Sequence, residues 1–360
     1  MRRIFATMRS KRLLIAGALA ASVPFVQAQG IEVKLSGQVN RGLLFVDDGV
    51  QSDSFHVDND NSSTRFRFSG TGEVTPGLKA GLLFEVEYQS SPSNVVTFAD
   101  RDGASPTLDE RYLDLFFEGR YGRLSMGQGD GAANGGVEVD LSGTSVAHYA
   151  DISAIGGAFA FRTAAGGSGP TMASVLSQQD FESRYDRLRY DTPAFAGARL
   201  ALSTGAKDSR DVQEAALWYS ADFARAGKLA AALGWSQEDP ALVGGVDDET
   251  VGGSVSWLAP GGLNLTYGYT QRDVSATREG KFNYLKVGYK TGKHAVSADY
   301  AMGDDQSAAG DEAKSMSLAY VYTPISWAEL FALAKKAQLD QPGVSYEDLT
   351  LVMVGTRLKF

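Results

Sequence analysis

The chain has 360 residues, with 34 Lys and Arg against 43 Asp and Glu, which gives a formal net charge of −9. It contains no cysteine, which excludes disulfide bridges and thiolate metal sites, and its acidic balance argues against a nucleic-acid partner.

The first 28 residues have the organisation of a secretory signal peptide. An apolar run, LLIAGALAASV, is followed by the small-residue site Val-Gln-Ala at 26–28. The basic residues before the run are Arg2, Arg3, Arg9, Lys11 and Arg12. The run has eleven residues, and a membrane-spanning helix needs about 20. We therefore predict cleavage near residue 28, which removes five basic and no acidic residues and lowers the net charge to −14.

From residue 33 onward the dominant sequence period is two, which is typical of β-strands with two different faces. In LNLTYGYT (263–270), for example, Leu and Tyr alternate with Asn, Thr and Gly. Beyond the signal, no apolar stretch is long enough for a membrane-spanning helix. We predict an all-β fold with sixteen strands near 33–46, 63–74, 78–90, 108–118, 123–129, 184–192, 198–206, 212–224, 228–237, 249–259, 262–272, 281–290, 294–302, 314–323, 327–337 and 349–360.

The joins between these strands alternate in length. Tight joins such as TPG (75–77) and PGG (260–262) alternate with longer, acidic ones such as DDGVQSDSFHVDNDN (47–61) and GDDQSAAGDE (303–312). In an up-and-down meander, alternate joins lie at opposite ends of the strands. Short turns at one end and long loops at the other are typical of an antiparallel transmembrane β-barrel.

A soluble β-sandwich is the alternative, because its strands alternate in the same way. The 332 residues after the signal would make an unusually large sandwich. Aromatic residues also gather near the predicted strand ends, as they do in the girdles of membrane barrels. They include Trp218, Tyr219, Trp235, Trp257, Tyr289 and Trp327.

One join, residues 130–183, is much longer than the others and is rich in Gly, Ala and Ser. Unstructured loops of such length are rare unless they are functional or disordered. In a barrel wide enough to leave a channel, the lumen is the available place for it. A disordered external flap is the alternative, although apolar residues such as Ile152, Ile155 and Phe159 favour packing. We predict a barrel domain over 29–360 with a constriction loop at 130–183.

Several segments resemble the general porins of Gram-negative outer membranes. They are IEVKLSGQVNRGLLFVDDG, STRFRFSGTGEV, GRYGRLSMGQGD, RYDRLRYDTPAFAG and the Phe-terminated VGTRLKF. Their order, with the long loop after the fifth predicted strand, matches this family over nearly the whole predicted mature chain. The resemblance implies a sixteen-stranded homotrimeric barrel in the bacterial outer membrane, with its long third loop folded inward. It also implies passive diffusion of small hydrophilic solutes instead of catalysis.

The resemblance further implies arginines on the wall that face carboxylates on the loop. The family positions on the second and fourth strands correspond to Arg65 and Arg111. Alternation places Arg67 on the same face as Arg65, and it turns Arg187 and Arg189 inward because their strand neighbours are apolar. We predict these five arginines as the basic wall of the constriction. Structural ion pairs on the wall are the alternative for each of them.

The facing acids are predicted to be Glu138 and Asp140, together with Asp151. The loop has GGVEVD where enterobacterial members of the family have Pro-Glu-Phe-Gly-Gly-Asp, so the carboxylates that line the pore are not carried over directly. Solvated loop charge is the alternative interpretation. Opposed charges at such a constriction would orient and select small solutes.

The chain ends on LVMVGTRLKF, in which apolar and polar residues alternate. In a closed barrel this last strand pairs with the first one, around 33–46, and leaves no free edge. Phe360 also resembles the family's terminal signal to the barrel-assembly machinery.

Other chemistry is sparse. The histidines, His56, His148 and His294, lie far apart without a metal-ligand spacing. Acidic external joins offer oxygen ligands that could hold Ca²⁺ or Mg²⁺ near lipopolysaccharide, although solvated surface charge is the simpler interpretation. These acids are Asp47, Asp48, Asp58 and Asp60 in one join, and Asp247, Asp248 and Glu249 in another. We predict no cofactor and no resident metal.

These observations predict an outer-membrane porin that forms a water-filled channel for small hydrophilic solutes and ions. A porin that prefers anionic solutes is the principal alternative. An outer-membrane barrel enzyme and an adhesin are further alternatives, and the sequence shows no grouping of nucleophile, base and orienting residue that an enzyme would need.

Overall fold

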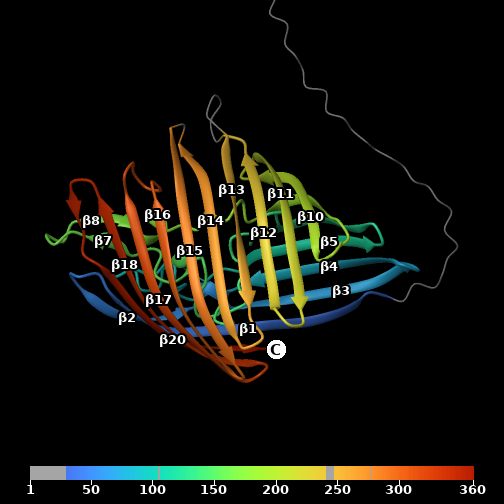
Figure 1. Ribbon diagram of the computed structural model, residues 1–360, viewed down its shortest axis with the longest axis horizontal. Coiled ribbons are helices and arrows are strands. Elements are labelled where there is room, and N and C mark those ends of the chain that lie inside the picture. The colour runs from blue at the N-terminus through green and yellow to red at the C-terminus, as the bar shows by residue number, and fades with distance from the viewer. Residues whose placement is uncertain (1–29, 104–105, 241–246, 276) are drawn as a thin grey trace, which may run out of the picture.

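The computed structural model describes residues 30–103, 106–240, 247–275 and 277–360, which form a closed antiparallel β-barrel (Figure 1). The predicted signal peptide, residues 1–28, lies outside the described residues. One sheet of eighteen strands contains sixteen wall strands and two short additions, β2 and β19. The sixteen-stranded, all-β prediction is therefore confirmed.

The wall strands are β1 (Glu32–Asp47), β3 (Arg65–Thr75), β4 (Leu78–Glu87), β5 (Asp109–Gly119), β6 (Gly122–Asp130), β9 (Arg184–Asp191), β10 (Ala198–Lys207), β11 (Arg210–Phe223), β12 (Gly227–Glu238), β13 (Asp248–Leu258), β14 (Leu263–Ser275), β15 (Arg278–Thr291), β16 (His294–Asp304), β17 (Glu312–Ile325), β18 (Ala328–Gln341) and β20 (Leu349–Lys359). The shorter elements are β2 (Ser52–Asp58), β7 (Ala160–Arg162), β8 (Ser168–Thr171), β19 (Val344–Ser345), the 3₁₀ turns η1 (Asp60–Ser62) and η2 (Ile152–Ala154), and the helix α1 (Met172–Val175). Among the described residues, no helix is long and apolar enough to cross a bilayer.

Side-chain alternation explains the two faces of the wall. On β14, the outer residues Leu265 and Tyr267 are 42% and 46% exposed, whereas the inner residues Asn264 and Thr266 are 0% and 3% exposed. Successive side chains of a strand point to opposite faces, so one sequence period produces an apolar outer belt and a polar inner surface.

The first and last wall strands close the barrel. β1 pairs with β20 in antiparallel register, from Gln38 opposite Lys359 to Asp47 opposite Thr350. At the end of the chain, Phe360 and Gly37 exchange two backbone hydrogen bonds of 2.9 and 3.0 Å. The predicted pairing of the last strand with the first is confirmed.

Residues 47–61 differ from their prediction as an irregular external join. They contain β2, which pairs with the C-terminal half of β1 (41–47), while the N-terminal half of β1 (32–38) pairs with β3. Phe55 and Val57 on β2 are buried. Their alternation with polar residues spans only a few positions among many acids, so the acidic composition of the segment obscured the strand.

Tight turns join the strands at the end of the barrel where the chain terminates. At Gly122, the first residue of β6 after the turn from β5, φ is +114° and a Cβ would lie 2.2 Å from the carbonyl oxygen of Asp191. A side chain is incompatible with that close approach to β9, which explains why glycine occupies this turn.

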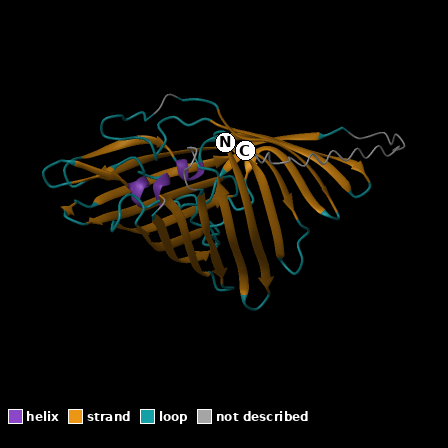
Figure 2. Cartoon of the chain, turned by 90° about the horizontal axis from the view of Figure 1, so that it is seen from above, coloured by secondary structure: helices purple, strands orange, loops and turns teal. Residues whose placement is uncertain are grey.

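Residues 131–183, here called the long loop, connect β6 to β9. Figure 2 shows short helical turns and connecting segments inside the outline of the wall strands. The hydrophobic core lies where the second half of the long loop packs against the inner faces of β1, β2, β17, β18 and β20. The barrel interior is therefore filled on that side.

Candidate functional site

The long loop follows the inner wall strand by strand. Leu141 N donates to Ser256 Oγ on β13 (3.0 Å), and Thr144 Oγ1 lies 2.8 Å from Ser297 Oγ on β16. On the return limb of the loop, Gln178 O accepts a hydrogen bond from Thr270 Oγ1 on β14 (2.7 Å). These anchors are small neutral side chains that alternation turns inward, so the loop backbone can approach the wall closely.

Apolar contacts fix the second half of the loop. Phe159 packs edge-on against Phe55 and Phe98, with ring centroids 5.4 and 5.1 Å apart. The inner wall is apolar here: Leu44, Leu351 and Met353 are fully buried. The loop is thus part of a folded core in this region.

Trp218 belongs to this inner surface. Its indole Nε1 donates to Ala132 O at the start of the long loop (3.0 Å), and its ring is partly buried against the core. The expectation that Trp218 forms part of an outer aromatic girdle was wrong, because alternation on β11 turns it inward beside Ala216. Trp327, in contrast, is exposed on a tight turn.

Arginines gather on the wall that the loop leaves uncovered, around one buried carboxylate. Glu85 on β4 is fully buried and accepts from Arg111 Nε (2.8 Å), Arg67 Nε (2.6 Å) and Arg65 Nη1 (3.5 Å). Arg111 also bonds Glu87 through Nη1 (2.6 Å). Shared hydrogen bonds to one ionised group hold the guanidinium groups in fixed positions.

A polar cavity of 540 Å³ separates this arginine wall from the long loop. From β3 and β5, Arg65 and Arg111 line it, and Arg184 and Arg272 line it from β9 and β14. The acidic lining residues are Asp60, Glu87, Glu138, Asp151 and Asp180. Four cations and five acids therefore share one water-accessible space between the wall and the loop.

The two further arginines of the cavity, Arg272 and Arg184, also lie beside acidic residues. Arg272 forms a two-pronged bond with Asp248 (2.9 and 2.8 Å) and approaches Glu182 at 3.1 Å. Arg184 lies 3.9 Å from Asp130. Sequence reasoning missed Arg272. It stands two residues after the inward Thr270 on the same strand, so alternation places it on the inner face as well. Sequence reasoning also missed Asp180, which stands in the loop without any periodic pattern.

The acids on the loop side have weakened acidity. Burial raises the pKa of Asp180 to about 7, against backbone N–H bonds from Val137 and Gly135 that lower it. Burial, reinforced by Asp180 and Asp151, also raises the pKa of Glu138 well above its usual value. Near neutral pH part of this acidic edge is therefore protonated.

Asp60 stands apart from the long loop, on the turn η1 beside the arginine wall. Burial, followed by repulsion from Asp151, raises its pKa to about 7. Its carboxylate accepts from Gln89 Nε2 (3.1 Å). Charge at this position also changes around neutral pH.

The structure brings four predicted site residues to the cavity: Arg65, Arg111, Glu138 and Asp151. Arg67 points inward but its guanidinium is directed to Glu85, outside the cavity lining.

The other predicted residues lie behind the cavity surface. Arg187 forms a buried two-pronged ion pair with Asp114 (2.8 and 3.0 Å). Arg189 bonds Asp191 in the same manner (both distances 3.0 Å). Asp140 faces the wall, where Lys286 Nζ donates to it at 2.7 Å. A buried partner of opposite charge neutralises each of these groups, so alternation alone could not separate them from lining residues.

The external acids have local roles in the described residues. Asp48 Oδ1 accepts from Val50 N and Gln51 N and so closes the β1–β2 turn. Asp248 holds Arg272. Within the described ranges, no three His, Cys, Asp or Glu side chains gather in a way that could hold a metal ion.

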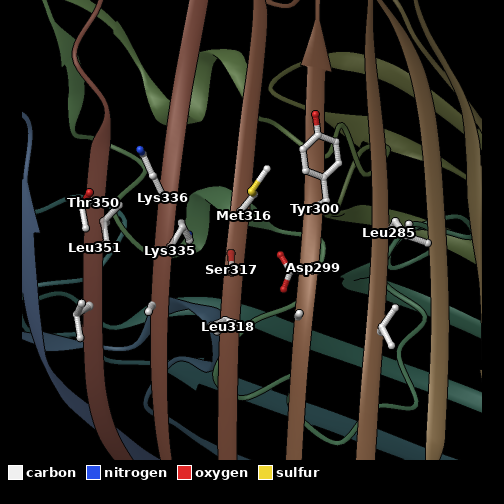
Figure 3. A pocket seen from close by; sticks show the side chains of 14 residues that line it. Leu285, Asp299, Tyr300, Met316, Ser317, Leu318, Lys335, Lys336, Thr350 and Leu351 are labelled. Carbon is white, nitrogen blue, oxygen red and sulfur yellow. The ribbon is translucent and has the colours of Figure 1, made fainter.

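An apolar hollow of 630 Å³ lies on the outer face of β15–β18 and β20 (Figure 3). Leu285, Met316 and Leu318 line it, and all three are more than half exposed. A mostly apolar surface of this kind on the outer face of a barrel fits lipid acyl chains.

Comparisons with known proteins agree with this architecture. The profile of a family described as Gram-negative porin matches residues 13–324, most of the chain. An anion-selective porin from Comamonas acidovorans is 21% identical, with a TM-score of 0.65 over 92% of this chain and 100% of that one. OmpT of Vibrio cholerae, in vitro folded and in its trimer form, is 16% identical, with a TM-score of 0.58 over 92% and 100%. A triple mutant of Rhodopseudomonas blastica porin is 16% identical, with a TM-score of 0.56 over 91% and 100%. Among curated protein sequences, none matches.

Proposed function

Because the chain belongs to the family of Gram-negative porins, we propose that solutes cross its lumen through the cavity between the arginine wall and the long loop. The protein is an outer-membrane β-barrel that forms a water-filled channel for passive diffusion of small hydrophilic solutes. The observation that carries the proposal is the polar cavity in which Arg65, Arg111, Arg184 and Arg272 face carboxylates of the loop. Such an arrangement limits solute size and orients dipolar solutes by its transverse field.

Reconstitution in planar bilayers tests this proposal. We expect an ohmic single-channel conductance and swelling of liposomes by small sugars, with a size limit set by the cavity. A matched pair of substitutions, Glu138→Trp in the cavity and Met316→Trp on the lipid face, locates the narrowest point. Only the first variant should exclude the larger sugars. Equal sugar permeation by both variants would place the narrowest point elsewhere.

A preference for anionic solutes is the second candidate. It is favoured by the four arginines of the cavity together with the raised pKa of Glu138, Asp60 and Asp180, which reduces the opposing negative charge. One porin of similar fold is called anion-selective. Solute-dependent block of the chloride current separates the two: block by a small organic anion supports a specific site, and its absence supports a general pore.

The family and the fold point to a channel and away from an enzyme. We propose that the chain has no catalytic role and does not serve mainly as an adhesin. Two assays test this: hydrolysis of ester and peptide substrates by the refolded protein, and conductance in bilayers. Hydrolysis by the pure barrel would overturn the first part, and a barrel that binds cells but does not conduct would overturn the second.

We propose a homotrimer, in keeping with the trimer form of one structural relative. A second support comes from Arg41, which shares the outer face of β1 and β20 with the exposed Leu43 and Val354. Among the described residues, its guanidinium bonds Ser90 O (2.5 Å) and approaches Asp58 at 3.8 Å. A lipid-facing arginine costs about 2–4 kcal/mol at mid-membrane, so a covering subunit would remove this cost. The molar mass in detergent tests the proposal, and a monomer would contradict it.

We propose the remaining partners, which are the assembly machinery, lipid and divalent cations, from residues exposed on the surface of the barrel. Phe360 follows the end of β20 and is 65% exposed, and we propose that it is recognised by the barrel-assembly machinery. Deletion of Phe360 should reduce the trimer yield more than the conductance of those trimers that form. Outer-membrane lipid and lipopolysaccharide are the proposed surroundings. Binding of Ca²⁺ or Mg²⁺ by the external acids is tested by calorimetry against an Asp247→Asn and Glu249→Gln variant.

A further inference from the structure

Four inward-facing side chains form a row across four neighbouring wall strands. Lys286 on β15 pairs in register with Asp299 on β16, which pairs with Ser317 on β17, which pairs with Lys335 on β18. Figure 3 shows Asp299, Ser317 and Lys335 beside one another on their strands. Lysine and aspartate are rarely buried, yet the exposed fractions of Lys286, Asp299 and Lys335 are 0%, 7% and 2%.

The long loop covers this row and supplies its partners. Asp140 and the carbonyl oxygen of His148 accept from Lys286 Nζ at 2.7 and 2.8 Å. The imidazole Nε2 of His148 lies 3.1 Å from Ser317 Oγ and 3.3 Å from Asp299 Oδ1. Lys335 Nζ donates to the carbonyl oxygens of Ile152 (2.5 Å) and Ile155 (3.0 Å).

The charges of this assembly balance. Lys286 and Lys335 provide two cations, and Asp140 and Asp299 provide two anions. Burial lowers the pKa of His148, against the attraction of Asp299, so its imidazole is neutral at pH 7. Buried ion pairs add little net stability because desolvation opposes their attraction, and similar apolar residues would hold the loop as firmly. Their hydrogen bonds fix the position and orientation of particular loop groups, and this role explains their presence better than added stability.

The position of Lys335 shows what that role is. Ile152 and Ile155, whose carbonyls it holds, are the first residue of η2 and the residue that follows it. Asp151 caps the same turn, because its Oδ1 accepts from Ser153 N and Ala154 N at 3.1 Å each. Asp151 also lines the cavity opposite the arginine wall. One turn of backbone therefore connects the buried ammonium group to a carboxylate in the solute path.

We propose that Lys335 is a positioning residue that fixes the carboxylate of Asp151 in the channel and thereby sets the ion selectivity of the pore. This inference rests on the proposed function of the cavity as the constriction. Lys335 acts through two backbone carbonyls and one capped turn. The direct field of the Lys335 charge disfavours K⁺, whereas the carboxylate that Lys335 positions favours K⁺, so the two effects on the permeability ratio have opposite signs.

The experiment compares Lys335→Met with Lys336→Met. Lys336 is the next residue, points to the outer face, and pairs with Asp348 at 2.6 Å, so it controls for loss of a lysine from β18. Reversal potentials in a KCl gradient give the permeability ratio of K⁺ to Cl⁻. Lys335→Met should lower this ratio because Asp151 is no longer held, whereas Lys336→Met should leave it unchanged. Simple loss of the Lys335 charge would raise the ratio instead.

A double substitution shows whether the effect passes through Asp151. Asp151→Asn keeps the capping oxygen and removes the charge, since Asn caps helices as well as Asp. Lys335→Met should have no further effect on the permeability ratio in this background. If the Met variant does not assemble, Lys335→Gln replaces it. Gln keeps two N–H donors on a side chain one atom shorter, so a smaller shift of the same sign is expected.

Three outcomes overturn the inference: an unchanged ratio in the folded Lys335 variant, a shift toward K⁺, or additivity with Asp151→Asn. A wild-type barrel that does not conduct would overturn the proposed function, and this inference with it. A wild-type channel that conducts while Lys335→Met behaves like Lys336→Met would overturn this inference alone.

Discussion

The two halves of the inner wall differ in chemistry, and the difference decides where the channel lies. On β3 and β5 the inward positions carry Arg65 and Arg111, which line the water-accessible cavity and share the buried Glu85 on β4. On the strands from β10 onward the inward positions are largely small neutral or apolar residues, which the long loop covers. A loop backbone approaches Ser, Thr, Ala and Gly closely, whereas it cannot displace solvated arginines that already share a buried carboxylate. The size and charge of the wall side chains therefore determine where the loop packs, and the cavity remains beside the arginines.

In the charged half of the wall, substitution of Glu85 should cause the largest loss of barrel stability. Replacing Glu85 by Gln leaves Arg65, Arg67 and Arg111 without their common carboxylate. Removing one partner from a buried ion pair costs about 3–5 kcal/mol, and we expect the upper part of this range because three partners are affected. Urea unfolding of the refolded barrel measures the loss. Glu87→Gln, at the cavity edge, is the control and should cost less; an equal loss would contradict the central role of Glu85.

The covered half should depend on apolar packing of the loop. Phe159→Ala removes a ring that is buried against Phe55 and Phe98, and such substitutions cost about 3 kcal/mol. The loop should then move on the wall, which we expect to see as fluctuating single-channel currents. Phe117→Ala, the same substitution on the exposed outer face of β5, should leave the current steady. Steady currents in both variants would show that the loop does not need this core.

The smallest expected effect is the response of the cavity to pH. Asp60 and Asp180, each with a pKa of about 7, are mostly ionised at pH 8 and mostly protonated at pH 6. Protonation removes negative charge opposite the arginines, so the permeability ratio of K⁺ to Cl⁻ should fall by about twofold as the pH falls from 8 to 6. Reversal potentials at both pH values measure it. An Asp60→Asn, Asp180→Asn variant should lose the dependence, and an unchanged dependence there would assign it to other groups.

Alternation along the chain predicted much of this picture. The family resemblance placed Arg65 and Arg111 on the inner wall, and alternation added Arg67, Arg187 and Arg189, because a strand has only two faces. Alternation could not distinguish Arg65, which reaches the cavity, from Arg187, whose guanidinium is neutralised by Asp114 on β5.

The loop residues were harder to place, since their partners are far away in sequence. Asp140 meets Lys286 across 146 positions, and His148 meets Ser317 across 169. Contacts between residues so far apart in sequence depend on how the whole loop packs against the wall, and a local sequence pattern does not encode them. The apolar residues of 130–183 did indicate that the loop packs, but they did not indicate against which strands.

The measurement that tests the central claim most directly compares two arginines of the same strand. Arg65 and Arg67 both point inward on β3 and both bond Glu85, but only Arg65 lines the cavity. If solutes pass between the arginine wall and the loop, Arg65→Gln should shift the reversal potential toward K⁺ selectivity while Arg67→Gln leaves it near the wild-type value. Equal shifts in both variants, or a shift in Arg67→Gln alone, would contradict this account of the channel.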